Sequence, residues 1–137
     1  MVPARERAVA FVVVRLSSSR LPAKQLRKIG QRTILEWIVD NLRLCQELDG
    51  IVLATVAEPE NEILREVAQR LRLPLFWYEG DVNHVTTRLR LAAEHHQADI
   101  CLLISADCPL IHAPAIDELI RQMRRSPEAD CLTEEEM

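Results

Sequence analysis

The chain is poor in aromatic residues and glycine, and it has no long apolar run. Aromatic residues make up 4% of its 137 residues, and glycine occurs three times. No hydrophobic stretch approaches the roughly 20 residues that a membrane-spanning helix needs, and the amino-terminal residues lack the cleavage pattern of a signal peptide. Binding of extended nucleic acid would require a broad basic surface with stacking aromatics. We therefore expect a cytoplasmic protein that binds neither a membrane nor nucleic acid.

The cysteines show no CxxC pair. They stand at Cys45, Cys101, Cys108 and Cys131, and in a cytosolic protein isolated thiols are expected to stay reduced. Cys101, Cys108 and His112 could be combined into a metal site, but their spacing matches no standard zinc module. We expect free thiols.

The length and composition are those of one globular domain. Hydrophobic residues make up 48% of the chain and charged residues 28%, which is typical of a folded chain with a proper core. We expect an α/β domain over residues 1–126, followed by a polar tail over residues 127–137.

Apolar segments alternate with amphipathic ones along the chain. The apolar segments, at about residues 8–14, 50–55, 74–78 and 99–104, are expected to be buried strands. Helical spacing predicts helices at about 33–45 with Thr33 as N-cap, from Pro59 to Leu71, at 84–97 and from Pro114 onward. Strict alternation of strand and helix predicts a mainly parallel sheet with helices on both faces.

A basic loop follows the first expected strand. Its sequence, Arg15-Leu16-Ser17-Ser18-Ser19-Arg20-Leu21-Pro22-Ala23-Lys24, carries three cations and three consecutive hydroxyls. Open α/β sheets bind ligands at the carboxyl ends of their strands. Such a loop can offer backbone N–H groups, hydroxyls and fixed positive charge to a polyphosphate. The alternative is a solvated basic loop without a ligand.

Positive charge is concentrated toward the amino-terminal end. Residues 1–32 contain eight Lys or Arg against one acid, a net charge of +7, whereas the remainder has nine against twenty, a net charge of −11. A basic segment on an acidic body favours a local anionic ligand.

A carboxylate follows the fourth expected strand. Asp107 stands in Ser105-Ala106-Asp107-Cys108-Pro109, so it should lie at the same sheet edge as the basic loop. Phosphate-bound Mg²⁺ is typically held by one or two carboxylates together with phosphate oxygens and water. Asp107 is therefore a candidate magnesium ligand, and the alternative is an Asp that caps the turn before Pro109.

Together, the two motifs resemble the cytidylyltransferases that activate sugars with CTP. The likeness is greatest to the spore-coat polysaccharide biosynthesis family, with CMP-sialic acid and CMP-Kdo synthetases as relatives. That family has Arg-x-Gly-Ser-x-Arg-Leu-Pro-Gly-Lys after its first strand and Thr-Ala-Asp-Cys-Pro-Leu after a later one. Residues 15–24 and 106–110 fall on these motifs. Residues 51–55 look like the family's second strand, and Gly80 with residues 84–88 looks like its Gly-x-x-x-Asp-Val-Leu-x-Arg element.

The resemblance implies a three-layer, Rossmann-like fold of the glycosyltransferase-A kind. It also implies a nucleotidyltransferase that uses CTP and Mg²⁺ to activate a sugar or sugar acid for surface polysaccharide, and it allows a homodimer. The implied catalytic residues are Arg15, Arg20 and Lys24, and the implied metal ligand is Asp107. The implied nucleotide-binding residues are Ser17, Ser18, Ser19, Ala54, Thr55, Arg88, Ser105 and Ala106.

The chain departs from the family pattern at several positions. Ser17 and Ala23 stand where the family has Gly, and glycine there permits a close approach of backbone to phosphate or a positive φ. His84 replaces an Asp and Thr86 replaces a Leu. Family members also continue beyond the length of this chain. The alternative function is therefore a catalytically impaired nucleotide- or partner-binding module of the same fold.

Overall fold

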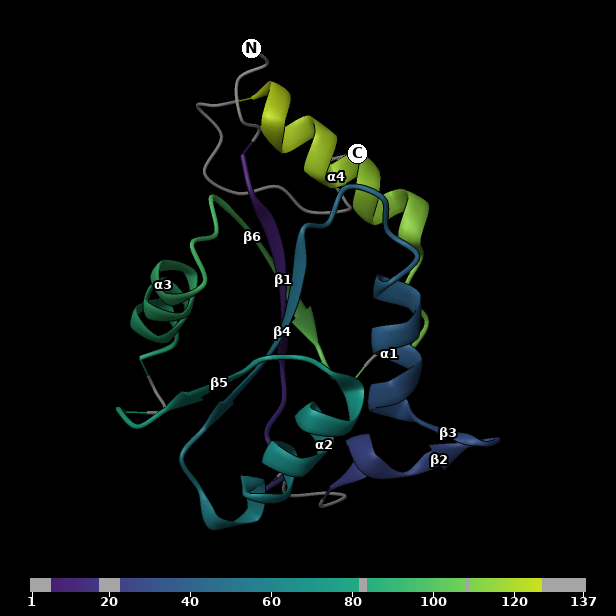
Figure 1. The fold of residues 1–137 in the computed structure, drawn as a ribbon, viewed down its shortest axis with the longest axis vertical. Helices are drawn as coiled ribbons and strands as arrows, with labels where there is room; N and C mark the ends of the chain where they lie inside the picture. Colours follow the sequence, from purple (N-terminus) through teal and green to yellow (C-terminus); the bar gives the residue numbers. More distant parts are fainter. Residues whose placement is uncertain (1–5, 18–22, 82–83, 108, 127–137) are drawn as a thin grey trace.

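The computed structural model describes residues 6–17, 23–81, 84–107 and 109–126, and they form an α/β fold around a four-stranded sheet (Figure 1). The strands lie in the order β5-β4-β1-β6, and every neighbouring pair is parallel. Their bounds are β1 Ala8–Val13, β4 Gly50–Val56, β5 Leu75–Tyr78 and β6 Ile100–Ser105. The parallel α/β sheet predicted from the sequence is confirmed.

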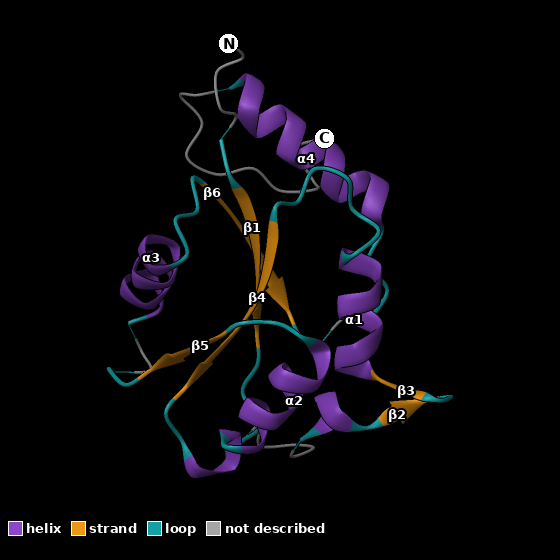
Figure 2. Ribbon diagram, viewed as in Figure 1, coloured by secondary structure: helices purple, strands orange, loops and turns teal. Residues whose placement is uncertain are grey.

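Helices cover both faces of this sheet and give it three layers (Figure 2). Three of the described helices lie on one face, and α3 lies on the other. Their bounds are α1 Ile34–Leu42, α2 Ile63–Leu71, α3 Val85–His95 and α4 Ala113–Arg125.

The two faces of the sheet bury different amounts of apolar surface. Successive strand residues point to opposite faces, so Ala8, Ala10 and Val12 of β1 face α1, α2 and α4 in the larger core cluster. Val9 and Phe11 face α3 and belong to a much smaller cluster. Beside Phe11 in the register, Leu103 of β6 is 52% exposed. The α3 face is therefore thinly covered, and its side next to β6 is open.

The start of α1 agrees with the sequence, but its end does not. Thr33 is the N-cap, and its hydroxyl accepts from the Glu36 N–H while the Glu36 carboxylate accepts from the Thr33 N–H. This reciprocal capping satisfies two donors of the first turn. The helix ends at Leu42 rather than Cys45, because Cys45 N–H donates to the Leu42 carbonyl three residues back and tightens the chain into a turn.

Pro59 opens a single 3₁₀ turn, Pro59–Asn61, that precedes α2. The first helical residue of α2 is Ile63. The proline therefore starts the helical segment, as expected, but in the tighter geometry that is frequent at helix amino ends.

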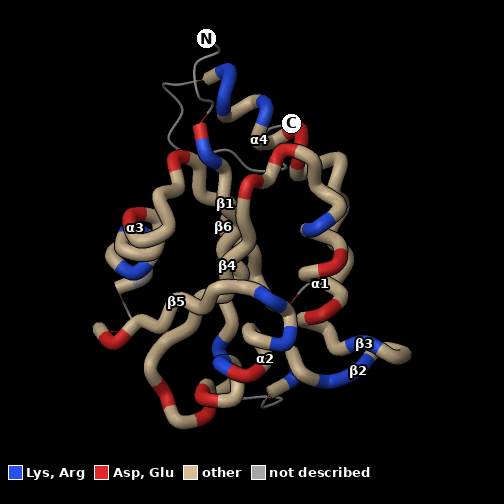
Figure 3. Tube along the Cα trace, in the orientation of Figure 1, with Lys and Arg blue, Asp and Glu red and all other residues tan. Residues whose placement is uncertain are grey.

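A small hairpin between the basic loop and α1 was not predicted. Strands β2 (Lys28–Ile29) and β3 (Arg32–Thr33) pair in antiparallel fashion across a turn in which Gly30 has φ 71°. Basic residues lie on both strands (Figure 3). The Trp37 indole of α1 donates to the Ile29 carbonyl at 2.8 Å and fastens the hairpin to the helix. Two-residue strands are too short to show an alternating pattern in the sequence.

Candidate functional site

The basic loop begins and ends at one point of the sheet edge. Leu16 follows β1, and its carbonyl accepts from the Ala23 N–H at 2.9 Å, so the two sides of the loop are joined at its base. The Leu16 N–H donates to the buried Asn61 side chain at 2.9 Å. Predicted phosphate-binding residues Ser18, Ser19 and Arg20 lie outside the described residues.

Ala23 adopts a backbone conformation that favours glycine. Its φ is 57° and its ψ is 29°, in the left-handed region. A Cβ atom is strained there, whereas glycine is not. The prediction that this position suits glycine because of a positive φ is therefore confirmed for Ala23. Ser17 has no such φ.

Arg15 is held by the carboxylate of Glu58, which lies just after β4. Its Nε and Nη2 donate to the two oxygens of Glu58 at 2.8 and 2.7 Å, a bidentate pair. The hydroxyl of Ser17 donates to the same carboxylate at 3.1 Å. These hydrogen bonds hold the pKa of Glu58 below its usual value, and the one from Arg15 has the largest effect. Glu58 therefore remains charged and fixes the first two polar side chains of the loop.

Lys24 and Asp107 meet at the same edge. The Lys24 ammonium lies 3.1 Å from Oδ1 of Asp107, and the Gln25 amide donates to that oxygen at 3.2 Å. Gln25 is 4% exposed, and its own Oε1 is buried without a hydrogen-bond partner among the described residues. Both donors lie on Oδ1, and the Asp107 side chain is 55% exposed. Its second oxygen can therefore accept a further donor or a cation.

A pocket of about 720 Å³ opens between this edge and α3. Its floor is apolar and includes Phe11, Ala54 and Phe76 from three strands, and α3 contributes Arg88 and Leu89. The polar side chains at its rim are Arg15, Ser17, Gln25, Ser105 and Asp107. An apolar floor with a few convergent polar groups is typical of a small-ligand site.

The pocket brings together part of the predicted nucleotide-binding set. Ala54, Arg88 and Ser105 line it, with Ser17 from the loop. Thr55 and Ala106 are buried on the other side of the sheet edge, where the Thr55 hydroxyl donates to the Val14 carbonyl at 2.6 Å and the Ala106 N–H donates to Val13. These two residues hold the end of β1 in place rather than face the pocket.

The positive charge of the amino-terminal segment is more dispersed than the sequence suggested. Arg7 lies at the amino end of β1, where its backbone N–H bonds to Asp99. Arg32 is paired with Asp40 and Glu36 at the hairpin. Among the cations in the described part of residues 1–32, Arg15 lines the pocket, and Lys24 is paired with Asp107, which also lines it.

Sequence reasoning missed three residues that organise this edge, Glu58, Asn61 and Gln25. Glu58 and Asn61 follow β4, the strand beside β1, so the shared carboxyl edge was the available signal. Gln25 directly follows Lys24, but its burial under Asp107 could not be read from its neighbours in the sequence.

The cysteine candidates do not assemble into a metal centre in the part of the chain that the structure describes. Cys101 is exposed on β6, Cys45 is half-buried, and both thiols are free. Burial raises the pKa of Cys45 to about 11, which keeps it a neutral thiol. Cys108 lies outside the described residues. No described helix has the length and apolar character to span a membrane.

Sequence comparison supports the family suggested by the motifs. A model of the cytidylyltransferase family matches residues 9–137. The 3-deoxy-manno-octulosonate cytidylyltransferase of Acidobacterium capsulatum is 32% identical over 103 residues, which cover 75% of this chain and 40% of the relative. The enzyme of the same name from Bdellovibrio bacteriovorus is 23% identical over 125 residues, covering 91% of this chain and 49% of the relative. The chain spans about half the length of the curated relatives it matches.

Solved structures share the fold. A cytidylyltransferase from Leptospira borgpetersenii superposes with a TM-score of 0.74 at 24% identity, covering 87% of this chain and 49% of that one. A CMP:2-keto-3-deoxy-manno-octonic acid synthetase solved with CTP gives a TM-score of 0.75 at 23% identity, covering 88% and 48%. The Rossmann-like nucleotidyltransferase fold is thereby confirmed. Because the family model extends over nearly all of the sequence, the chain belongs to the cytidylyltransferase family.

Proposed function

We propose that the chain binds CTP with Mg²⁺ and carries the nucleotide half of a cytidylyltransferase that activates a sugar acid. The observation that carries this proposal is the meeting of Arg15, Lys24 and Asp107 at the edge of one pocket with an apolar floor. The pocket volume of about 720 Å³ can accommodate a nucleoside, and Arg15 together with the Lys24–Asp107 pair would supply the positive charge that a triphosphate requires. The names of the relatives point to 3-deoxy-manno-octulosonate as the acceptor.

Each described residue has a separate role in this proposal. Lys24 and Arg15 would bind phosphate oxygens by charge-assisted hydrogen bonds. Arg20, which lies outside the described residues, would add a third cation. Ala54, Arg88 and Ser105 would contact the nucleoside, and the buried Thr55 and Ala106 would hold the strand ends that position them.

Asp107 fits a magnesium ion that also takes ligands from phosphate. One of its carboxylate oxygens has no partner among the described residues, and the buried Gln25 amide holds the other. In the described part of the chain no three His, Cys, Asp or Glu side chains converge as a metal cage. Mg²⁺ is commonly bound by a single protein carboxylate together with substrate phosphates. When bound, it would offset the negative charge of the phosphates and of the departing pyrophosphate.

The reaction requires little covalent help from the protein. An acceptor oxygen would attack the α-phosphorus of CTP, forming a new P–O bond as the bond to the bridging β-phosphate oxygen breaks. The acceptor hydroxyl loses its proton to water, and pyrophosphate leaves. Lys24 and Arg15 would hold the phosphates in line and offset their charge, which is the main catalytic contribution in such transfers.

A second candidate function is a nucleotide-binding module impaired in catalysis. It is favoured by the side chain of Ala23 at a position that suits glycine. Both functions share CTP binding. Release of pyrophosphate separates them. A homodimer, a cytoplasmic location and a role in surface polysaccharide belong to the transferase proposal.

The test is titration calorimetry of CTP and CMP into the 137-residue chain in Mg²⁺ buffer, followed by a pyrophosphate assay with 3-deoxy-manno-octulosonate. CTP should bind more tightly than CMP, and added salt should weaken both. Equal affinities would remove the phosphate-loop argument. If CTP binds, pyrophosphate release supports the transferase, and binding without release supports the module.

A further inference from the structure

Glu58 lies directly behind the arginine that faces the pocket. Arg15 and Ser17 both line the pocket, whereas Glu58 is not among its described lining residues. The Glu58 side chain is 20% exposed and that of Arg15 is 51% exposed. A ligand in the pocket would therefore contact the guanidinium, whereas the carboxylate lies on the side of the guanidinium away from the ligand.

Glu58 is itself held in place. The amide of Asn61 donates to Glu58 Oε1 at 3.3 Å and to the Val56 carbonyl at 3.0 Å. The other end of the same amide accepts from the Leu16 N–H. Asn61 is fully buried. One side chain thus ties the end of β4, the carboxylate of Glu58 and the base of the loop into a single unit.

The bidentate pair leaves part of the guanidinium available. A guanidinium carries five N–H groups, and Glu58 takes those on Nε and one on Nη2. The Nη1 edge has no hydrogen-bond partner among the described residues. Arg15 can therefore bind a phosphate oxygen without releasing Glu58. A fixed guanidinium also loses less rotamer freedom when the phosphate arrives.

We infer that Glu58 is a positioning residue for the nucleotide: it holds the Arg15 guanidinium in the orientation that binds a phosphate of CTP. This inference rests on the proposed function, because it assigns a role within the same site. Glu58 acts through Arg15 and makes no contact with the nucleotide itself. Alternatively, the Glu58 carboxylate would compete with phosphate for Arg15. In that case removal of its charge would strengthen CTP binding rather than weaken it.

Three variants measured by titration of CTP in Mg²⁺ buffer test the inference. Glu58→Gln keeps the shape and an oxygen for Asn61 but loses the charged bidentate acceptor, so CTP should bind roughly fivefold or more weakly. Glu60→Gln is the matched control, because Glu60 is an exposed acid of the same segment that interacts with Arg15 only through its charge. It should leave CTP affinity within about twofold. Arg15→Lys keeps the positive charge but lacks the planar, paired N–H donors of the guanidinium. It should weaken CTP binding as Glu58→Gln does.

A double-mutant cycle shows whether Glu58 acts through Arg15. In an Arg15→Ala background, Glu58→Gln should weaken CTP by less than about twofold, because the group that it positions is gone. Thermal unfolding of each variant shows whether the fold persists. If Glu58→Gln does not fold, the CTP affinities of Arg15→Lys and Arg15→Ala are compared instead. Equal losses in the two variants would show that the oriented, paired N–H donors of Arg15 are required and that positive charge alone is not sufficient.

The outcomes separate this inference from the proposed function. A wild-type chain that binds no CTP overturns both. A wild-type chain that binds CTP, with Glu58→Gln equal to Glu60→Gln, overturns only the role of Glu58. Tighter binding by Glu58→Gln would show that the carboxylate competes with phosphate. Equal losses in the wild-type and Arg15→Ala backgrounds would show that Glu58 acts independently of Arg15.

Discussion

Lys24 and Asp107 form an ion pair of 3.1 Å across the carboxyl edge of the sheet. Lys24 is the last residue of the basic loop and the first of the short helix Lys24–Leu26, and Asp107 follows β6. Both side chains are partly exposed, and ion pairs of this kind contribute little stability. Phosphate and a cation could therefore replace the two partners of this pair at small cost.

We expect Asp107→Asn to abolish most of the magnesium dependence of CTP binding. The substitution keeps the size of the side chain but removes the charge that a hard cation requires. Unfolding free energy should change by less than about 1 kcal/mol, since the ion pair is partly exposed. Calorimetry with and without Mg²⁺ measures the first effect. Glu79→Gln, which removes an exposed acid after β5, is the control. Full magnesium dependence in Asp107→Asn would leave Asp107 as a turn cap.

Lys24→Ala should weaken CTP by roughly tenfold or more, because it removes one charge-assisted contact to phosphate. CMP, with fewer phosphates, should lose less. Lys28→Ala on the hairpin is the matched control, because Lys28 is exposed and lies in β2. If both variants lose CTP affinity equally, the effect is one of net charge rather than of a contact by Lys24.

Ala23→Gly should raise the unfolding free energy by about 0.5–1 kcal/mol. Glycine relieves the left-handed strain, which costs an L-residue about 1–2 kcal/mol, and part of this gain is offset by the greater freedom of glycine in the unfolded chain. Denaturant unfolding measures the change. Ala57→Gly, at an exposed loop residue without a positive φ, should instead destabilise by about 0.4–1 kcal/mol. A loss of stability in Ala23→Gly would contradict the left-handed conformation.

Thr33→Ala should cost about 1 kcal/mol of stability, since it removes the N-cap hydroxyl of α1. Thr86→Ala, at an exposed residue in the first turn of α3, should cost much less.

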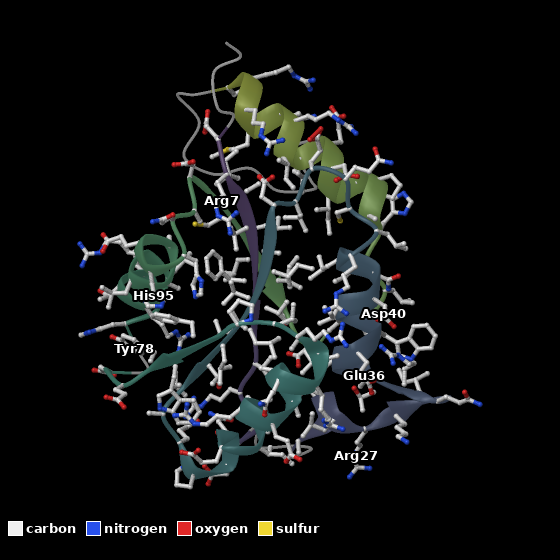
Figure 4. The ribbon with its side chains drawn as sticks, viewed as in Figure 1. Arg7, Arg27, Glu36, Asp40, Tyr78 and His95 are labelled. Atoms are coloured by element: carbon white, nitrogen blue, oxygen red, sulfur yellow. The ribbon has the colours of Figure 1, made fainter. Side chains whose placement is uncertain are left out.

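Glu36 lies at the start of α1 beside the hairpin (Figure 4). The Thr33 backbone N–H is the largest cause that lowers the pKa of Glu36 below its usual 4.5.

The lowered pKa of Glu36 gives the cap a pH dependence with a definite sign. A carboxyl whose pKa is lower in the folded state stabilises the protein above its ordinary pKa and loses that contribution as the pH falls through the folded value. Thermal unfolding between pH 6 and about 3 should therefore show a loss of stability, to which Glu36 contributes. Glu36→Gln should lose less than the wild type. Equal acid losses would mean that the capping carboxylate has the same pKa in both states.

The sequence determined the four strands of the parallel sheet and the start of α1. Apolar runs and helical spacing are local signals, so the four strands, the parallel sheet and the Thr33 cap could be predicted from neighbouring residues. The positive φ at Ala23 could also be predicted, because the family that the chain resembles has a glycine at this position. The β2–β3 hairpin was not, since two-residue strands carry no periodicity.

Only the tertiary structure decided how the charges at the sheet edge are paired. Glu58 holds Arg15, and Asp107 meets Lys24 and Gln25, although each partner comes from a different part of the chain. The identity of such partners depends on strand order and register, which bring the ends of β1, β4 and β6 together. The sequence by itself therefore determined that Arg15, Lys24 and Asp107 reach this edge, whereas Glu58, Asn61 and Gln25 were found there only in the tertiary structure. Their pairing follows from long-range packing, because a side chain of a few ångströms contacts only what the sheet places beside it.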